Sequence, residues 1–207
     1  LKRDEARVVG VGADLADGMR YVRTQPLLLL LLMLELVRVV VAMPYMSLLP
    51  AFAEEELGFD ASGLGMLQST IGFGGLVASL IATQLGAIKA KGRLLVRATL
   101  LMGLGLIAYV SVHWLPVVFL ALALVGGLGN LYMVLSGTLL LTHSDPVYRG
   151  RVVSLSMMAW GLMPLGTIPS GALADRVGVP WVVAAQGVIL MAVFGLVSRR
   201  KPVLAMM

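Results

Sequence analysis

Six long stretches of apolar residues, separated by short polar segments, follow one another along the chain. Whole windows of about 20 residues in several of them lack charged side chains, and an α-helix needs that length to cross the hydrocarbon core of a membrane. A water-soluble domain would instead alternate polar and apolar faces. The pattern predicts an all-α integral membrane protein whose transmembrane domain, residues 26–198, contains six spans at about 26–50, 61–88, 94–112, 116–141, 152–174 and 181–197.

A polar segment, residues 1–25, precedes the first predicted span. Within it Leu15, Met19 and Val22 recur at spacings of four and three, with charged residues between them. This spacing predicts an amphipathic helix that lies at a membrane interface.

The composition agrees with lipid as the main solvent. Hydrophobic residues make up 59% of the 207 residues and charged residues 13%, whereas a soluble domain has about 25% charged residues. The formal net charge of +5 alone would also suit a nucleic-acid-binding protein, but the basic residues gather between the apolar stretches. Cysteine is absent from the sequence, which excludes a disulfide framework and a thiolate metal site.

The basic residues also predict an orientation. Of the 16 Lys and Arg residues, 14 lie at or near the segments on one side of the predicted membrane domain. Because basic residues accumulate on the cytoplasmic side, both termini, including a tail at 199–207, are expected in the cytoplasm of a multi-pass plasma-membrane protein. The acidic segment AEEELGFD is then outside. Tyr45, Trp114 and Trp181 are expected at the outer boundary, where aromatic rings favour the headgroup level.

Glu35 and Arg38 lie well inside the first predicted span. A charged side chain at the centre of a membrane helix costs about 2.5 to 3.5 kcal/mol, so each needs compensation. Their spacing of three places them on one helix face, where they can pair. In one interpretation, Glu35 carries a proton for a transporter while Arg38 tunes its pKa and contacts substrate. The alternatives are a static ion pair that orients the span and a lipid-facing position.

Polar residues inside the other spans are candidates for the lining of a cavity. Interhelical hydrogen bonds explain each of them more simply, and the set comprises Gln68, Ser69, Gln84, Asn130, Tyr132 and Gln186. We favour Gln68 and Asn130 as substrate-site residues because each lies mid-span beside a cluster of glycines. Pro44 in the first span and Gly126 to Gly129 in the fourth are expected to interrupt corresponding helices, as in transporters built from inverted repeats.

Three parts of the sequence resemble a known transporter family. They are DLADGMRYVRTQPLLLLL, GFDASGLGMLQSTIGFGG, and DPVYRGRVVSL with MPLGTIPSGALADRVG. Together they resemble the C-terminal six-helix half of the major facilitator superfamily, in its enterobactin exporter-like branch of drug and siderophore exporters. The resemblance implies half of a 12-helix bundle, completed by an N-terminal six-helix half, that exports amphipathic small molecules by alternating access with protons as the coupling ion. The start at Leu1 rather than Met agrees with a piece of such a transporter.

The best-known signature of that family is only partly present. It is a G-x-L-A-D-R-x-G-R-type loop after the second helix of each half, and here the segment 86–93 reads GAIKAKGR. Ala90 and Lys91 stand in place of the Asp-Arg pair. An inner-gate role is therefore expected only of Lys89 and Arg93.

Charged residues also mark both ends of the fifth span. Asp175 and Arg176 belong to GALADRVG, a closer match to the signature, but the charge distribution places them outside, as an outer-loop cap or turn or else an outer gate. Arg149 and Arg151 are expected to interact with helix C-termini or anionic lipid headgroups on the cytoplasmic side. A regulatory inner gate is the alternative for these two.

The sequence carries no signature of catalysis. His113 and His143 lie at span boundaries, and no HExxH or carboxylate cluster indicates a metal site. GxSxG and GxxxxGK[ST] are absent, so neither an enzyme nor an ATPase motor is expected, and no cofactor is implied. An importer of small polar solutes and a non-transporting scaffold or sensor remain as alternatives.

Overall fold

The computed structural model describes residues 11–84 and 90–200, which fold into helices joined by short turns, without a strand. In chain order the helices are α1 (Val11–Thr24), α2 (Pro26–Val37), the π-helix η1 (Arg38–Ala42), α3 (Tyr45–Glu55), α4 (Ala61–Gln84), α5 (Lys91–Ser111), α6 (Leu115–His143), α7 (Arg149–Gly161), α8 (Pro164–Val177) and α9 (Val179–Arg200).

Six segments of the described chain are long and apolar enough to cross a membrane, so the predicted number is confirmed there. They are Pro26–Glu55, Ala61–Thr83, Lys91–Ser111, Leu115–His143, Arg149–Val177 and Val179–Arg200. Most extend a few residues beyond the predicted limits, because the polar residues at their ends remain helical. The predicted end of the second span, 85–88, lies outside the described residues.

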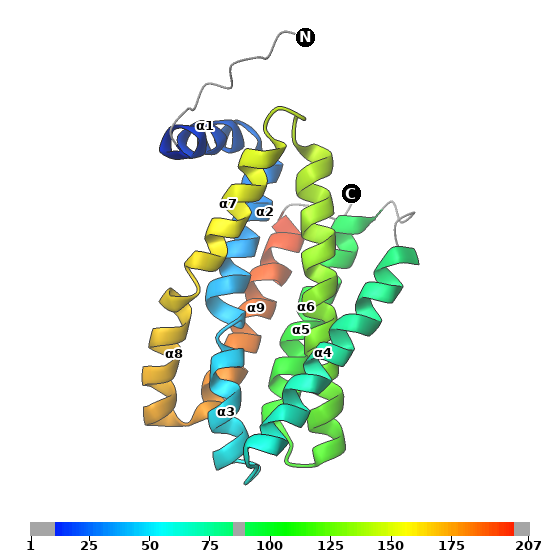
Figure 1. Ribbon diagram of the computed structural model, residues 1–207, viewed down its shortest axis with the longest axis vertical. Coiled ribbons are helices and arrows are strands. Elements are labelled where there is room, and N and C mark those ends of the chain that lie inside the picture. Colours follow the sequence, from blue (N-terminus) through cyan, green and yellow to red (C-terminus); the bar gives the residue numbers. More distant parts are fainter. Residues whose placement is uncertain (1–10, 85–89, 201–207) are drawn as a thin grey trace, which may run out of the picture.

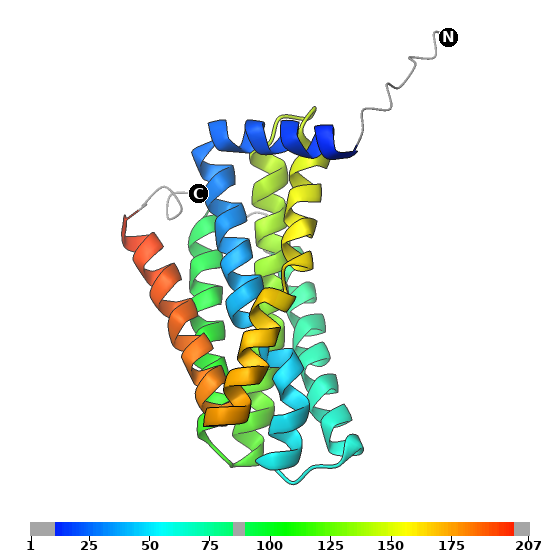
Figure 2. The ribbon, with the colours of Figure 1, turned by 90° about the vertical axis from the view of Figure 1, so that its left-hand side faces the viewer.

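The spans run roughly along one axis and form a bundle, and α1 lies across one end of it (Figures 1 and 2). The most extensive helix contacts join α4 to α6 and α5 to both α6 and α9. On α1, Val22 is fully buried, and Leu15 and Met19 pack against the core. The apolar stripe of α1 therefore faces the bundle.

The two ends of the bundle differ in charge. The end that carries α1 and the α6–α7 connection, here called the basic end, holds Arg20, Arg23, Lys91, Arg93, Arg97, Arg149, Arg151, Arg199 and Arg200. The opposite end, here called the acidic end, holds Glu54, Glu55, Glu56, Asp60 and Asp175, together with one arginine, Arg176. Trp114 and Trp181 are exposed at the acidic end, at 66% and 73%.

The expected interfacial position of Tyr45 is wrong. Tyr45 is only 2% exposed, and its ring lies edge-on to that of Tyr109 with centroids 6.5 Å apart. The first span continues to Glu55, which leaves Tyr45 inside the bundle rather than at its end.

The fourth span is not interrupted at Gly126 to Gly129, contrary to expectation. α6 is a continuous helix from Leu115 to His143. Its glycines serve packing against α4, because a methyl group added at Gly126 would overlap the backbone carbonyl of Ile71. Gly74 of α4 approaches α6 in the same way, against the carbonyl of Ala123. Small residues thus bring the two backbones into direct contact.

The first span is interrupted between α2 and α3, around the expected Pro44. The N–H of Met43 donates to the carbonyl oxygen of Arg38 at 3.2 Å, a π-helical bond to the fifth preceding residue. Pro44 has no N–H, and in a regular α-helix its ring would crowd the carbonyl of Val40, four residues earlier. The helix therefore widens over Arg38–Ala42 before α3 begins.

The fifth span, predicted at about 152–174, is also interrupted. α7 ends at Gly161, and α8 begins at Pro164 after a short turn. Figure 2 shows both interruptions near the middle of the bundle. They touch, because a methyl group added at Gly166 would overlap the carbonyl of Val40 and lie 3.0 Å from the Pro44 ring.

Candidate functional site

Glu35 and Arg38 form a buried ion pair at the interruption of the first span. Glu35 lies in the last turn of α2, and Arg38 is the first residue of η1. Nη2 of Arg38 donates to Oε1 of Glu35 at 3.2 Å, and the residues are 1% and 3% exposed. The pairing expected from their spacing is present, and neither side chain is on the surface of this bundle.

Aromatic and hydroxyl groups compensate part of the burial of this pair. Cζ of Arg38 lies 4.6 Å from the ring centroid of Tyr132 and 5.5 Å from that of Trp160, within the range of cation–π attraction. The hydroxyl of Ser136 donates to Oε2 of Glu35 at 3.5 Å. Nε of Arg38 is buried and has no hydrogen-bond partner in the described part of the chain. The guanidinium therefore retains a donor for a further acceptor.

Two hollows meet at the ion pair, one on the carboxylate side and one on the guanidinium side. The carboxylate hollow has a volume of about 230 Å³, and its lining includes Glu35, Met133, Ser136, Ser156, Met157 and Trp160. The guanidinium hollow has a volume of about 330 Å³, and its lining includes Arg38, Met43, Met46, Met102, Asn130, Met133 and Trp160. Met133 and Trp160 border both hollows. The pair thus presents opposite charges to two adjoining spaces.

Asn130 and Gln68, the two favoured polar residues, lie in different surroundings. Nδ2 of Asn130 donates to the carbonyl oxygen of Gly75 at 2.7 Å and to the hydroxyl of Ser79 at 2.6 Å. Asn130 therefore both joins α6 to α4 and lines the guanidinium hollow. Gln68 is exposed on α4 and lines neither hollow.

Sequence reasoning missed the methionines and Trp160. The sequence contains 13 methionines, and no spacing marks which of them share a surface. In the structure, Met43, Met46, Met102 and Met133 come from different segments of the chain to line one hollow. Methionine has a flexible, polarisable side chain that adapts to ligands of different shape. Trp160 did have a local signal in the sequence, because it lies four residues before Pro164, where a helix interruption could be expected.

The basic residues considered for an inner gate, where the structure describes them, are separate from the ion pair. Lys89 lies outside the described residues, and Arg93 is exposed in the first turn of α5. Nε of Arg149 donates to the carbonyl oxygen of Leu141, near the C-terminal end of α6, at 3.2 Å. This is a contact with a helix C-terminus. Arg151 instead binds carboxylates of α1.

Asp175 and Arg176 are not in a loop, contrary to expectation. Both are exposed residues in the last turn of α8, which ends where Gly178 adopts a φ of 90°. Adjacent residues of a helix point in different directions, so these two do not face each other. The N–H of Gly178 donates to the carbonyl oxygen of Ala174 at 2.8 Å and closes the helix.

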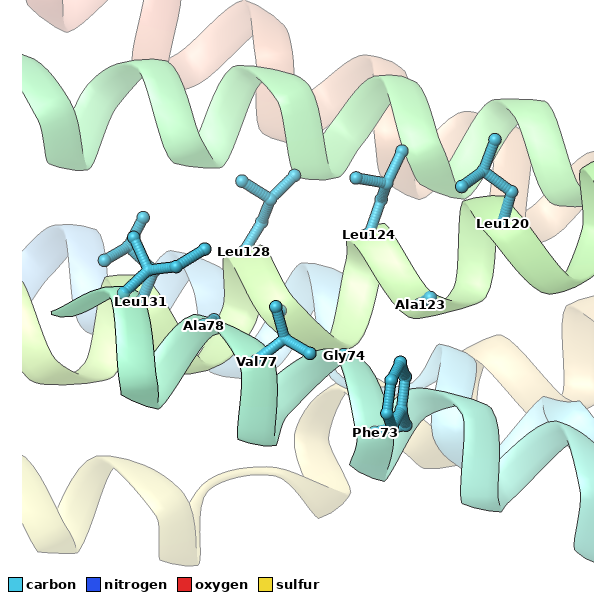
Figure 3. A pocket seen from close by; sticks show the side chains of 11 residues that line it. Phe73, Gly74, Val77, Ala78, Leu120, Ala123, Leu124, Leu128 and Leu131 are labelled. Atoms are coloured by element: carbon cyan, nitrogen blue, oxygen red, sulfur yellow. The ribbon is translucent and has the colours of Figure 1, made fainter.

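A third hollow lies on the surface between α4 and α6, apart from the ion pair (Figure 3). It has a volume of about 270 Å³ and is lined only by apolar residues, among them Phe73, Val77, Leu124 and Leu128. Its lack of polar groups suits lipid chains rather than selective recognition. Among the described residues, no group of three or more His, Cys, Asp or Glu side chains could hold a metal ion.

Comparison with known proteins connects this architecture to transport. A family model described as "transmembrane secretion effector" matches residues 4–206. The multidrug efflux pump Tap of Mycobacterium tuberculosis (strain ATCC 25618 / H37Rv) is 28% identical over 202 residues, 96% of this chain and 47% of the pump. Tap of Mycolicibacterium fortuitum is 26% identical over 168 residues, 80% of this chain and 41% of the pump.

A further relative is named for a siderophore. The staphyloferrin A transporter of Staphylococcus aureus (strain NCTC 8325 / PS 47) is 21% identical over 159 residues, 75% of this chain and 40% of that protein. The chain thus spans less than half the length of these curated relatives. No solved structure matches it. With a family model that covers nearly all of its length, the chain belongs to the transmembrane secretion effector family of the major facilitator superfamily.

Proposed function

We propose that the chain forms half of a secondary active transporter that exports amphipathic small molecules, drug-like or siderophore-like, by alternating access in exchange for protons. Its family and the names of its efflux-pump relatives support export. The observation that carries the proposal is the buried Glu35–Arg38 pair, placed at a helix interruption and open to two hollows. Buried ionisable groups in membrane helices commonly mark ion and substrate pathways.

In this proposal Glu35 is the proton carrier. Its carboxylate can accept either a proton or a hydrogen-bond donor of the substrate, and the two compete for the same oxygen atoms. A proton neutralises Glu35 and weakens its attraction to Nη2 of Arg38, so that Nη2, in addition to the unpartnered Nε, becomes available to another acceptor. Exchange of substrate for protons requires such competition, because the bound proton lowers the affinity of the site for substrate and bound substrate lowers its affinity for the proton.

The hollows support a broad substrate class. The guanidinium hollow, at about 330 Å³, lies at the lower end of the size range of small-molecule sites. Its methionines and Trp160 suit apolar or aromatic bodies, while Arg38 and Asn130 offer polar contacts. We propose that the N-terminal six-helix half supplies the opposite wall of a larger cavity.

We further propose that the basic end faces the cytoplasm of a plasma-membrane protein. The support is the concentration of Lys and Arg at that end and of carboxylates at the other. On this orientation both ends of the chain and α1 lie on the cytoplasmic side.

The test measures efflux of an amphipathic fluorescent dye from proteoliposomes that contain the full-length protein under an imposed pH gradient. Glu35→Gln is expected to abolish the gradient-driven component, a fall of at least about tenfold, because an amide cannot carry the proton. Glu54→Gln, an exposed residue at the acidic end, is the matched control and should transport normally. Unchanged gradient dependence in Glu35→Gln would falsify the coupling role and leave a static ion pair.

A further inference from the structure

Arg151, at the start of α7, forms ion pairs with two aspartates of α1. Nε and Nη2 of Arg151 both donate to Oδ1 of Asp14, at 3.2 and 2.7 Å, and Nη1 donates to Oδ2 of Asp17 at 2.7 Å. The aspartates are three residues apart on α1, so both face the same guanidinium. Cζ of Arg151 also lies 5.3 Å from the ring centroid of Tyr148. A single side chain thereby satisfies two carboxylates of a helix that is distant in sequence.

Aromatic and backbone contacts extend this junction. The rings of Tyr21 and Tyr148 are stacked, with centroids 4.1 Å apart and planes inclined by 5°. The hydroxyl of Tyr21 accepts a hydrogen bond from the backbone N–H of Asp145 at 3.0 Å. A methyl group added at Gly18 would lie 2.9 Å from Cβ of Arg151, so the two backbones approach closely there. We call this group the α1 clasp, which comprises Asp14, Asp17, Tyr21, Tyr148 and Arg151.

The combination of contacts matters more than any one ion pair. The side chains of Arg151, Asp14 and Asp17 are 29%, 40% and 41% exposed, and a single ion pair at that exposure adds little stability. Arginine adds a planar fork that binds more than one carboxylate oxygen in fixed directions. The stacked tyrosines then fix the rotation of α1 on the bundle.

The clasp joins two interrupted spans at the basic end. α1 leads through Gln25 directly into α2, so a link from α1 to α7 is also a link from α2 to α7. α2 and α7 contact each other below it. Farther along, their interruptions meet where Gly166 packs against Val40 and Pro44. The first and fifth spans are therefore connected twice, at the basic end through the clasp on α1 and at their interruptions through Gly166 of α8.

We propose that Arg151, held by Asp14 and Asp17, is a positioning residue of the transport cycle that makes α2 and α7 move together about their interruptions. By moving as one body, the two helices keep Glu35 of α2 and Trp160 of α7, which line the same hollow, at a fixed spacing while the basic end opens and closes. This inference rests on the proposed function. It assigns Arg151 to a junction within the bundle rather than to lipid headgroups.

The test uses the full-length protein, with hydrogen–deuterium exchange in nanodiscs and dye efflux in proteoliposomes. Arg151→Gln is expected to speed exchange of the α1 amides about tenfold and to lower the maximal efflux rate about fivefold. The half-saturating dye concentration should stay unchanged because Arg151 lines neither hollow. The reversed-charge variant Asp14→Arg/Asp17→Asn/Arg151→Glu is expected to restore both readouts.

Arg200→Gln is the matched control, since it removes the same charge at an exposed position of the basic end and leaves the clasp in place. If Arg151→Gln does not reach the membrane, Asp14→Asn/Asp17→Asn makes the same test from α1. Unchanged exchange in α1 overturns the clasp. Faster exchange with an unchanged maximal rate overturns its role in transport. A wild-type protein that carries no dye defeats the proposed function, and the exchange data then decide the clasp alone.

Discussion

At the scale of single residues, the ion pair was visible in the sequence but its surroundings were not. Glu35 and Arg38 stand out because charged residues are expensive inside apolar spans. Tyr132 and Trp160, which contact the guanidinium, come from other helices, and apolar or aromatic residues are ordinary in a membrane span. Which of them meet the pair depends on helix packing, which a single sequence does not reveal.

Trp160 borders both hollows and is expected to contribute to substrate affinity. Trp160→Leu removes an aromatic surface that contributes about 1 kcal/mol beyond its apolar area, so the half-saturating dye concentration should rise about fivefold to tenfold. The maximal rate should change less, because Glu35 and Arg38 remain. Trp181→Leu, at an exposed position of the acidic end, is the control and should behave as the wild type in the same efflux assay. Equal effects of both substitutions would contradict a role for Trp160 in the site.

At the scale of helices, local signals were reliable and contacts between helices were not. Asp60 illustrates a local signal, because its carboxylate accepts hydrogen bonds from Ser62 and from the N–H of Gly63 at the start of α4. The bond from the Ser62 side chain is the main reason that the pKa of Asp60 is lowered. Pro164 begins α8 in the same local way, at a position inside the predicted span of 152–174.

Glycine clusters, by contrast, have two readings that the sequence does not separate. A glycine permits a bend, and it also permits close packing of a straight helix. Gly126 belongs to the second kind, because Ile71 of the neighbouring helix occupies the space of its missing side chain. The prediction of an interruption in the fourth span was wrong for this reason.

The seam between α4 and α6 gives a prediction with an internal control. Gly126→Ala places a methyl group against a backbone carbonyl that cannot move alone, and is expected to destabilise the bundle by about 1 to 3 kcal/mol. Gly137→Ala lies on the same helix with nothing within 4 Å of the added methyl group, and should be neutral or slightly stabilising. Thermal unfolding of the two detergent-solubilised variants compares them. A similar midpoint for both would show that the seam does not hold the helices together.

At the scale of the whole molecule, the number of spans followed from hydrophobicity alone. Each span must satisfy its backbone hydrogen bonds internally, so every long apolar stretch becomes a helix whatever its neighbours are. The interruptions between α2 and α3 and between α7 and α8 escape this rule in part. They occur where a proline removes a backbone donor and where a glycine, Gly166, lets another helix approach. The sequence shows the prolines, but it does not show which helix packs against the glycine.

Orientation is the remaining property of the whole bundle, and the chain suits a direct measurement because it contains no cysteine. His113→Cys places a thiol at the acidic end, and Val147→Cys places one in the 76% exposed position of the α6–α7 connection at the basic end. If the basic end is cytoplasmic, a membrane-impermeant maleimide added to intact cells should label position 113 and spare position 147. Permeabilised cells should label both, which controls for reactivity. Labelling of position 147 and not of position 113 in intact cells would place the basic end outside the cell. The proposed orientation would then be wrong, and the α1 clasp would lie on the exterior side of the membrane.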